Sequence, residues 1–172
     1  MKTLTTGSAK LLNAVSILTM LFMAFFLTMN QIAYGAGAPS SSSTTSDSAA
    51  GIREKANVHF KAGEGLQEMK KYPEASKKYE QAVKIDAKYA EAWSNLGYTY
   101  RKQGQFDRAV EAYKKAIKLK PDLAEAHEYL GEAYAEMGKF DLAEKELQIL
   151  RELGSDEADE LEEFIEKMKA KS

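Results

Sequence analysis

The sequence contains no cysteine. This absence excludes disulfide bonds, thiolate catalysis, lipid attachment at a cysteine and cysteine-based metal sites. It leaves the compartment open, because exported proteins can also lack cysteine. Histidine is nearly as scarce, with two residues, and no glycine-rich phosphate-binding loop is present. The chain therefore offers few of the residue types from which catalytic and metal sites are built.

A strong charge of either sign is also missing. The formal net charge of the 172 residues is -2, which gives no indication of a nucleic-acid partner. Apolar residues make up 44% of the chain, which is enough for one modest domain with a continuous core.

Residues 1–35 have the features of a targeting segment. Lys2 and Lys10 make the start positive, and residues 17–27 are almost all apolar. Small residues at 33–35 offer a signal-peptidase site, although an uncleaved anchor formed by residues 11–29 is the alternative. Both interpretations place the rest of the chain across the membrane, because the lysines precede the apolar run. We therefore expect an exported protein, in the bacterial periplasm or on the outer face of the cytoplasmic membrane.

Residues 36–51 (AGAPSSSSTTSDSAAG) are small and polar and show no periodicity. Such a segment cannot bury enough apolar surface to offset the entropy lost on ordering it. A disordered Ser/Thr-rich linker is therefore predicted here.

The rest of the sequence repeats itself every 34 residues, most clearly around residues 90–123. The aligned columns hold Gly63, Gly97 and Gly131; Tyr72, Phe106 and Phe140; Ala75, Ala109 and Ala143; and His59, Trp93 and His127. A period of this length is typical of an array of stacked supersecondary units.

Each period is predicted to form a helical hairpin. Apolar residues recur twice at helical spacing, with a break between the two runs. Gly104 and Gly138 fall in these breaks, where a helix end favours a left-handed residue. The aligned glycines inside the first helices each cost about 1 kcal/mol relative to alanine. We expect close packing against the aligned alanines of the second helices to compensate for this cost.

The middle unit resembles the tetratricopeptide repeat, which also has a period of 34 residues. The resemblance rests on Trp93, Leu96, Gly97, Tyr100, Ala109, Tyr113, Ala116 and Pro121. The flanking units depart from the pattern at His59, Ala62 and Ala87 and at Leu147, Leu150 and Ser155.

The resemblance implies an all-α fold, a right-handed helical-hairpin solenoid preceded by the N-terminal apolar targeting helix. Residues 52–155 would form three tetratricopeptide-like repeats, at about 56–89, 90–123 and 124–155, and residues 156–172 a C-terminal capping helix. Seven helices are expected, at 52–69, 73–85, 90–103, 106–119, 124–137, 140–153 and 156–170.

The last of these helices is predicted to cover the end of the array. Leu161, Phe164, Ile165 and Met168 follow helical spacing in a segment otherwise rich in charge, as a solvent-facing cap requires. Asp122 and Glu125 have the spacing of a capping box before the third unit.

Catalytic and metal sites are not expected. His59 and His127 occupy one repeat column two units apart, at a separation of about 20 Å, so they cannot share an ion. We interpret them as polar rings in an aromatic packing slot. The glutamates at helical spacing in residues 125–136 are typical of a solvated face rather than of paired catalytic carboxylates. No enzyme activity, metal or cofactor is predicted.

The resemblance also implies a partner-binding surface, because the first helices of tetratricopeptide hairpins line a concave groove. Carried onto this sequence, the groove residues are Asn57, Phe60, Glu64, Glu68, Glu91, Asn95, Tyr98, Arg101, Glu125, Glu128, Tyr129 and Glu132. This groove is mainly acidic, whereas the second helices carry most of the lysines. One subgroup of the family grips C-terminal carboxylates with lysine, asparagine and arginine, but of the matching columns here only Asn95 agrees.

We therefore expect a protein-interaction adaptor or scaffold that binds a protein or peptide through a basic segment in the acidic groove. Contact with a membrane is expected only through an uncleaved N-terminal segment. The alternative is a self-assembling structural scaffold, a homo-oligomer in which the acidic concave face of one copy meets the basic convex face of the next. Enzyme activity is the least supported of the three hypotheses.

Overall fold

The computed structural model describes residues 48–172, so the predicted targeting segment and most of the predicted linker lie outside it. The described part holds seven helices and no strand: α2 (Ala49–Glu68), α3 (Tyr72–Ile85), α4 (Ala90–Lys102), α5 (Phe106–Leu119), α6 (Ala124–Glu136), α7 (Phe140–Leu153) and α8 (Glu157–Lys169). The all-α prediction is confirmed for this part. None of these helices is both long enough and apolar enough to span a membrane.

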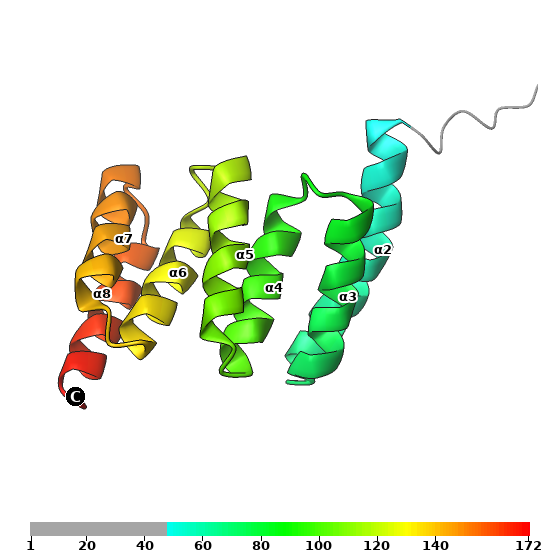
Figure 1. Ribbon diagram of the computed structural model, residues 1–172. Helices are drawn as coiled ribbons and strands as arrows, with labels where there is room; N and C mark the ends of the chain where they lie inside the picture. The colour runs from blue at the N-terminus through cyan, green and yellow to red at the C-terminus, as the bar shows by residue number, and fades with distance from the viewer. Residues whose placement is uncertain (1–47) are drawn as a thin grey trace, which may run out of the picture. The chain divides into compact units, whose positions relative to one another are not determined.

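The helices form three hairpins in sequence, α2 with α3, α4 with α5 and α6 with α7, followed by α8 (Figure 1). We call α2, α4 and α6 the first helices and α3, α5 and α7 the second helices. The second helix of each hairpin packs against the first helix of the next one. The predicted solenoid of three hairpins and a cap is therefore confirmed.

The turns inside the hairpins follow the predicted chemistry. Gly104 and Gly138 have φ angles of 73° and 69°, in the left-handed region that ends a helix at low cost for glycine. Lys70 occupies the same repeat column with φ 56°. The first hairpin therefore adopts the same turn without the residue that suits it best.

Two predictions about helix N-terminal ends need correction, while the other helices begin within one residue of their predicted starts. α2 begins at Ala49, three residues before the predicted start, because the Ser48 side chain accepts a hydrogen bond from the Gly51 N–H at 3.1 Å. The last three residues of the predicted linker are therefore helical. The capping box at Asp122 is wrong, since the residue that caps α6 is Leu123 and no side chain accepts a hydrogen bond there.

The glycines inside the first helices make room for large side chains rather than for alanines. A Cβ atom on Gly63 would lie 2.7 Å from a ring carbon of Tyr79, and one on Gly97 would lie 2.6 Å from a ring carbon of Tyr113. Both tyrosines come from the second helix of the same hairpin and are fully buried. The glycine therefore admits a core tyrosine, which accounts for the cost of placing it in a helix.

α8 closes the third hairpin, as predicted, and packs against both α6 and α7. Leu161 and Ile165 are buried, while Phe164 and Met168 are partly buried against the same core. The methyl groups of Leu161 lie where a Cβ on Gly131 would be, at 2.5 Å. In the third hairpin, a leucine of α8 thus occupies the space that a tyrosine fills in the first two.

Candidate functional site

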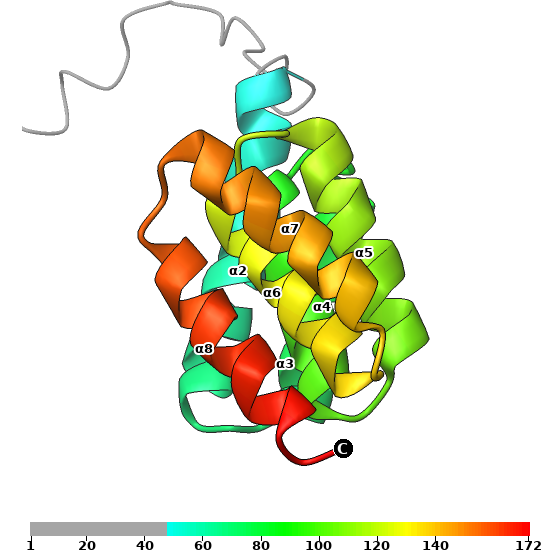
Figure 2. The same ribbon diagram turned by 90° about the vertical axis from the view of Figure 1, so that its left-hand side faces the viewer.

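α4 and α6 approach one another more closely than any two of the second helices do. α4 contacts α6, and α6 contacts α8, while no comparable contact joins α3, α5 and α7 in residues 48–172. Figure 2 shows α5 on the right of the array and α8 on the left, with α7 crossing in front between them. The solenoid therefore curves toward the first helices. We call the surface formed by the predicted partner-binding residues on α2, α4 and α6 the inner face.

An aromatic cluster lies at the centre of the inner face. The rings of Tyr98 on α4 and Tyr129 on α6 have centroids 5.2 Å apart, and Tyr72 meets Tyr98 at 6.2 Å. Tyr98 and Tyr129 are half-buried, so one part of each ring packs in the protein while the other remains accessible. Exposed aromatic surface of this kind suits contact with a peptide or with a cationic side chain.

Arg101 lies beneath these rings instead of on the surface. Its side chain is 2% exposed and forms ion pairs with Glu132 and, at 3.2 Å, with Glu136. The guanidinium carbon lies 5.6 Å from the Tyr98 ring centre and 5.9 Å from that of Tyr129. Arg101 thus joins α4 to α6 and supports the aromatic cluster from within, and a partner cannot reach it in this arrangement.

Acidic residues of α6 and α8 form the second part of the site. We call Glu125, Glu128, Glu157 and Glu160 the acidic cluster. Burial raises the pKa of Glu128 to about 7, and the charges of Glu132, Glu160, Glu157 and Glu125 act in the same direction. Burial also raises the pKa of Glu125, and the charge of Glu157 contributes to that shift. Within residues 48–172, neither Glu125 nor Glu128 forms an ion pair with a cationic side chain.

The helix dipole explains part of this cluster but not all of it. Glu125 lies in the first turn of α6, and Glu157 and Glu160 lie in the first turn of α8, where negative charge is favourable. Glu128 lies beyond the first turn and is partly buried among other carboxylates. Glu128 therefore lacks the helix-dipole interaction that stabilises the negative charge of the other three members of the cluster.

Other predicted inner-face residues are already engaged within the chain. Phe60 is buried and stacks on Tyr89 with centroids 4.8 Å apart, so it belongs to the core. Glu64 pairs with Lys61 at 2.7 Å, and Glu91 pairs with Lys120 at 3.2 Å.

Three further predicted residues lie at the margins of the face. Asn57 accepts a hydrogen bond from the Tyr89 hydroxyl at 3.2 Å, and the Asn95 amide donates to the Tyr79 hydroxyl at 3.4 Å. Glu68 is exposed near the end of α2. The residues that remain available together are therefore Tyr98, Tyr129, Glu125 and Glu128, at the α4–α6 side of the face.

Sequence reasoning did not identify the contribution of α8. The sequence pattern places Glu157 and Glu160 only in a charged capping helix, yet their charges raise the pKa of Glu128. The buried ion pairs of Arg101 could have been anticipated, since opposite charges occupy the inner columns of two adjacent repeats.

His127 and Trp93 share a structural role, in agreement with the predicted packing slot. Trp93 donates from Nε1 to the Ala87 carbonyl at 3.0 Å, and His127 Nε2 contacts the Pro121 carbonyl at 3.0 Å, one repeat later. The other nitrogen of His127 lies 2.7 Å from Glu146, and this hydrogen bond raises the pKa of the buried imidazole. Among residues 48–172, no group of three or more histidine, aspartate or glutamate side chains is placed to hold a metal ion.

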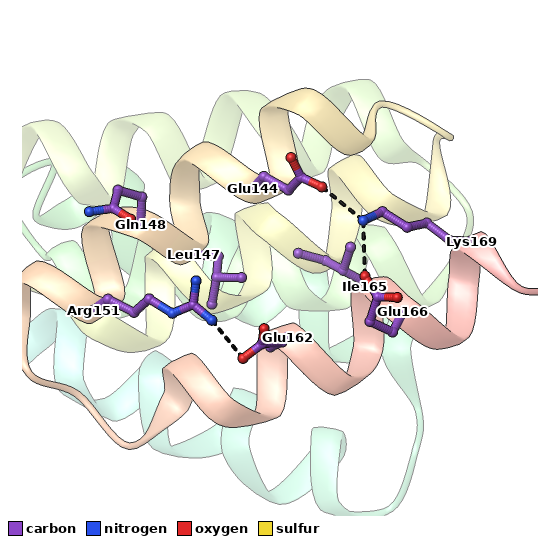
Figure 3. Close-up of a pocket in the computed structure, with 8 residues that line it drawn as sticks. All are labelled: Glu144, Leu147, Gln148, Arg151, Glu162, Ile165, Glu166 and Lys169. Atoms are coloured by element: carbon purple, nitrogen blue, oxygen red, sulfur yellow. Dashed lines mark hydrogen bonds and ion pairs between the residues drawn. The ribbon is translucent and has the colours of Figure 1, made fainter.

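A pocket of about 300 Å³ lies between α7 and α8 (Figure 3). Leu147 and Ile165 line it together with charged side chains. Arg151 pairs with Glu162 at 2.6 Å, and Lys169 pairs with Glu144 at 2.8 Å. Its opposite charges are thus already paired with one another, and these pairs fasten the cap to the third hairpin.

Comparisons with known proteins agree with this architecture. The family described as TPR repeat matches residues 63–104 and 97–138. A search of curated protein sequences gave no match.

Solved structures share the fold. The first TPR domain of Spaghetti (RPAP3), bound to the HSP90 peptide SRMEEVD, has a TM-score of 0.62 at 23% identity, covering 68% of this chain and 95% of that one. The TPR2B domain of yeast Sti1, in complex with an Hsp70 peptide, has a TM-score of 0.62 at 21% identity, covering 70% and 98%. MamA has a TM-score of 0.53 at 30% identity, covering 68% of this chain and 61% of MamA.

This fold is an interaction scaffold rather than a catalytic architecture. The period of 34 residues, the stacked hairpins, the family match and these structures lead to one assignment. Residues 63–138 belong to the tetratricopeptide repeat family, and residues 48–172 share its fold.

Proposed function

We propose that the protein is an adaptor that binds a basic polypeptide segment on its inner face, between the aromatic cluster and the acidic cluster. The observation that carries this proposal is Glu128, which is partly buried among carboxylates and has no cationic partner within residues 48–172. A lysine or arginine of a partner would supply the missing charge. Tyr129, whose pKa is raised by burial and by the charge of Glu128, and Tyr98, whose ring lies 5.2 Å from that of Tyr129, would contact the aliphatic part of that side chain or its cation.

The solved relatives support a polypeptide as the ligand but not its charge. The HSP90 peptide in the Spaghetti complex, SRMEEVD, carries three acidic residues. The acidic cluster would repel such a peptide, because it gathers carboxylates of α6 and α8. A partner with the opposite charge is therefore the better fit.

The N-terminal sequence favours an activity outside the cytoplasm. An apolar segment preceded by lysines favours export, and a cleaved leader or a retained anchor would leave the repeats on the same side of the membrane. We therefore propose an adaptor of the periplasm or of the outer face of the cytoplasmic membrane.

A binding measurement with charge-matched peptides tests the proposal. The probe is a fluorescein-labelled lysine-rich peptide, and the control is a glutamate-rich peptide of equal length. We expect fluorescence anisotropy to report binding of the lysine-rich peptide only, with affinity falling as the salt concentration rises above about 0.1 M. Binding of both peptides, or of neither, would contradict the proposal.

Two substitutions locate the binding surface. Glu128→Lys should weaken binding roughly tenfold or more, while Glu111→Lys, a control on the exposed surface of α5, should change it little. Tyr98→Ala should weaken binding more than any single glutamate substitution, because a packed ring commonly contributes more than a rim charge.

The self-assembly alternative requires the lysines of the second helices to bind the acidic inner face of another copy. Some of these cations already contact the chain's own rings, since Lys115 Nζ lies 4.3 Å from the centre of the Trp93 ring and Arg108 lies 3.9 Å from that of Tyr100. In that alternative, Lys118→Glu would weaken association as much as Glu128→Lys does. The peptide proposal expects Lys118→Glu to have no effect on peptide binding.

A further inference from the structure

The outer surface of α2 differs from the equivalent surfaces of α4 and α6. In α4, the columns at Ala92 and Leu96 are buried against the preceding hairpin, and the matching columns of α6 are buried as well. On α2 the same two columns hold Val58, which is 65% exposed, and Ala62, which is also exposed. α2 therefore presents a surface that the repeat pattern buries elsewhere, because no hairpin precedes it in residues 48–172.

This surface forms a continuous narrow stripe, which we call the α2 stripe. It consists of Val58, Ala62, Gly65 and Met69, spaced by four, three and four residues. That spacing is the seam of a coiled-coil heptad, which one helix uses to pack along another. A Cβ atom on Gly65 would meet nothing within 4 Å, and Met69 is 61% exposed. The stripe thus has large side chains at its ends and small residues at its centre.

Charges beside the stripe select one kind of occupant. Lys61 and Glu68 flank it on the same side, seven residues apart, with opposite charges. If a second copy of α2 packs antiparallel about a twofold axis, Val58 meets Met69 of the other copy and Ala62 meets Gly65. The same operation sets Lys61 opposite Glu68 of the other copy, twice by symmetry. In a parallel pair, Lys61 and Glu68 would instead lie beside the opposite edge of the stripe on the other copy. Leu66 lies on that edge and provides no opposite charge.

The monomer leaves Lys61 and Glu68 accessible for this role. Lys61 pairs with Glu64 at 2.7 Å, but its side chain remains 66% exposed. Glu68 is exposed as well. The segment directly before α2 is a poorer occupant, because residues 36–47 contain no leucine, isoleucine, valine, methionine or aromatic residue.

We propose that two copies of the chain associate through their α2 stripes in an antiparallel arrangement. α8, at the other end of the hairpin series, carries the exposed charges of Asp159, Glu162 and Glu163 and does not offer such a surface (Figure 1). The contact would involve Glu68 at the edge of each inner face but would leave Tyr98, Tyr129, Glu125 and Glu128 outside it, so a dimer would present two peptide-binding surfaces.

Sedimentation equilibrium of the purified full chain tests this association. We expect the mass to rise from monomer to dimer with concentration, and Val58→Glu to raise the dissociation constant at least tenfold. Val58 is mostly exposed, so the variant should retain the helical circular dichroism of the parent. A mass that does not depend on concentration, or a dimer that Val58→Glu leaves unchanged, would overturn the proposal.

A charge swap tests the antiparallel register. Lys61→Glu alone should weaken the dimer severalfold, and the double variant Lys61→Glu with Glu68→Lys should restore it. Failure of the double variant to restore the dimer would exclude this register.

The natural lack of cysteine allows a direct check by cross-linking. Ala62→Cys introduces a single thiol near the proposed twofold axis, and mild oxidation should give a disulfide-linked dimer. Glu163→Cys, on the exposed surface of α8, is the matched control and should remain monomeric on a non-reducing gel. Cross-linking through Glu163→Cys instead of Ala62→Cys would indicate contact between other surfaces and overturn the proposal.

Discussion

The two ends of the repeat array differ in how much apolar surface their terminal helices expose to solvent. At the C-terminal end, α8 buries Leu161 and Ile165 against the third hairpin and turns Asp159, Glu162 and Glu163 to solvent. At the N-terminal end, α2 leaves Val58 and Met69 exposed. In an array of stacked units, burial of a column depends on the neighbouring unit as much as on the residue. The charged outer surface of α8 thus ends the array toward solvent. At the N-terminal end, α2 keeps exposed apolar residues in columns that the neighbouring hairpin buries elsewhere.

The same contrast holds for the binding surface. α8 borders the inner face at α6 and adds Glu157 and Glu160 to its negative charge. α2 contributes Glu64 to the inner face, but its charge is paired with Lys61. The part of the inner face best suited to a cationic ligand therefore lies beside the cap.

Removal of the cap should have the largest effect. Deletion of residues 156–172 uncovers Leu147 and Leu150 and takes away the buried Leu161 and Ile165. Each large apolar side chain contributes about 1.5–3 kcal/mol on burial, so we expect a loss of roughly 5 kcal/mol and binding of a hydrophobic dye. Thermal denaturation would measure this loss. A truncated chain as stable as the parent would show that α8 is only an appended tail.

Glycine-to-alanine substitutions at two positions compare the stability effect of a new Cβ atom in the packed interior with its effect on the open N-terminal surface. Gly97→Ala should destabilise the protein by about 1–3 kcal/mol, because the new Cβ would lie 2.6 Å from the buried Tyr113 ring. Gly65→Ala is the matched control. Its Cβ would meet nothing within 4 Å, so the higher helix propensity of alanine should stabilise the fold by up to about 1 kcal/mol.

Urea denaturation of the two glycine variants would provide both free energies of unfolding. Equal changes in the two variants would contradict the packing role assigned to Gly97.

The acidic cluster predicts a pH-dependent stability. The pKa of Glu128 is about 7 in the folded protein, above its usual value, so the folded state holds this proton more tightly than the unfolded chain. Stability should therefore fall as the pH rises from about 4.5 to 7. Glu128→Gln should remove this loss and stabilise the protein by on the order of 1 kcal/mol above pH 7, allowing for solvent screening.

Melting temperatures of parent and Glu128→Gln across this pH range would test the effect. Glu111→Gln, at an exposed position of α5, is the control. A stabilisation of Glu128→Gln that is equally large at pH 4.5 would mean that the carboxylate charge is not its cause.

The smallest expected effect lies at the turn of the first hairpin. Lys70 has φ 56°, in the column that Gly104 and Gly138 occupy. Lys70→Gly should relieve the left-handed conformation and stabilise the protein by up to about 1 kcal/mol. Gly104→Lys should have the opposite effect. Chemical denaturation measures both, and a destabilising Lys70→Gly would show that the longer side chain makes a compensating contact.

The sequence was sufficient to predict the helices, the hairpins and the cap, because these depend on local signals. Gly104 marks a turn, and the apolar period defines the buried side of each helix. The cap followed from the spacing of Leu161 and Ile165 within a charged segment. The capping box failed, because the Asp122 spacing carries no information about where the preceding turn places its side chain.

The details of the site depend on contacts between repeats and were less accessible. A column position predicts which helix face a residue occupies, but Arg101 lies on that face and is nevertheless buried by its pairing with Glu132. Phe60 occupies an inner-face column and packs into the core beside Tyr89. The position of α8 beside Glu128 depends on tertiary packing, which the repeat pattern of the hairpins does not describe.

The most direct test of the proposed function is to map the peptide on the protein by nuclear magnetic resonance. The lysine-rich peptide would be titrated into isotope-labelled protein at low salt, and the backbone amide shifts followed residue by residue. The proposal predicts changes concentrated around Tyr98, Glu125, Glu128 and Glu157, on α4, α6 and α8, with little change on α3 and α5. Shifts centred on the second helices, or a peptide that perturbs no part of the inner face, would contradict it.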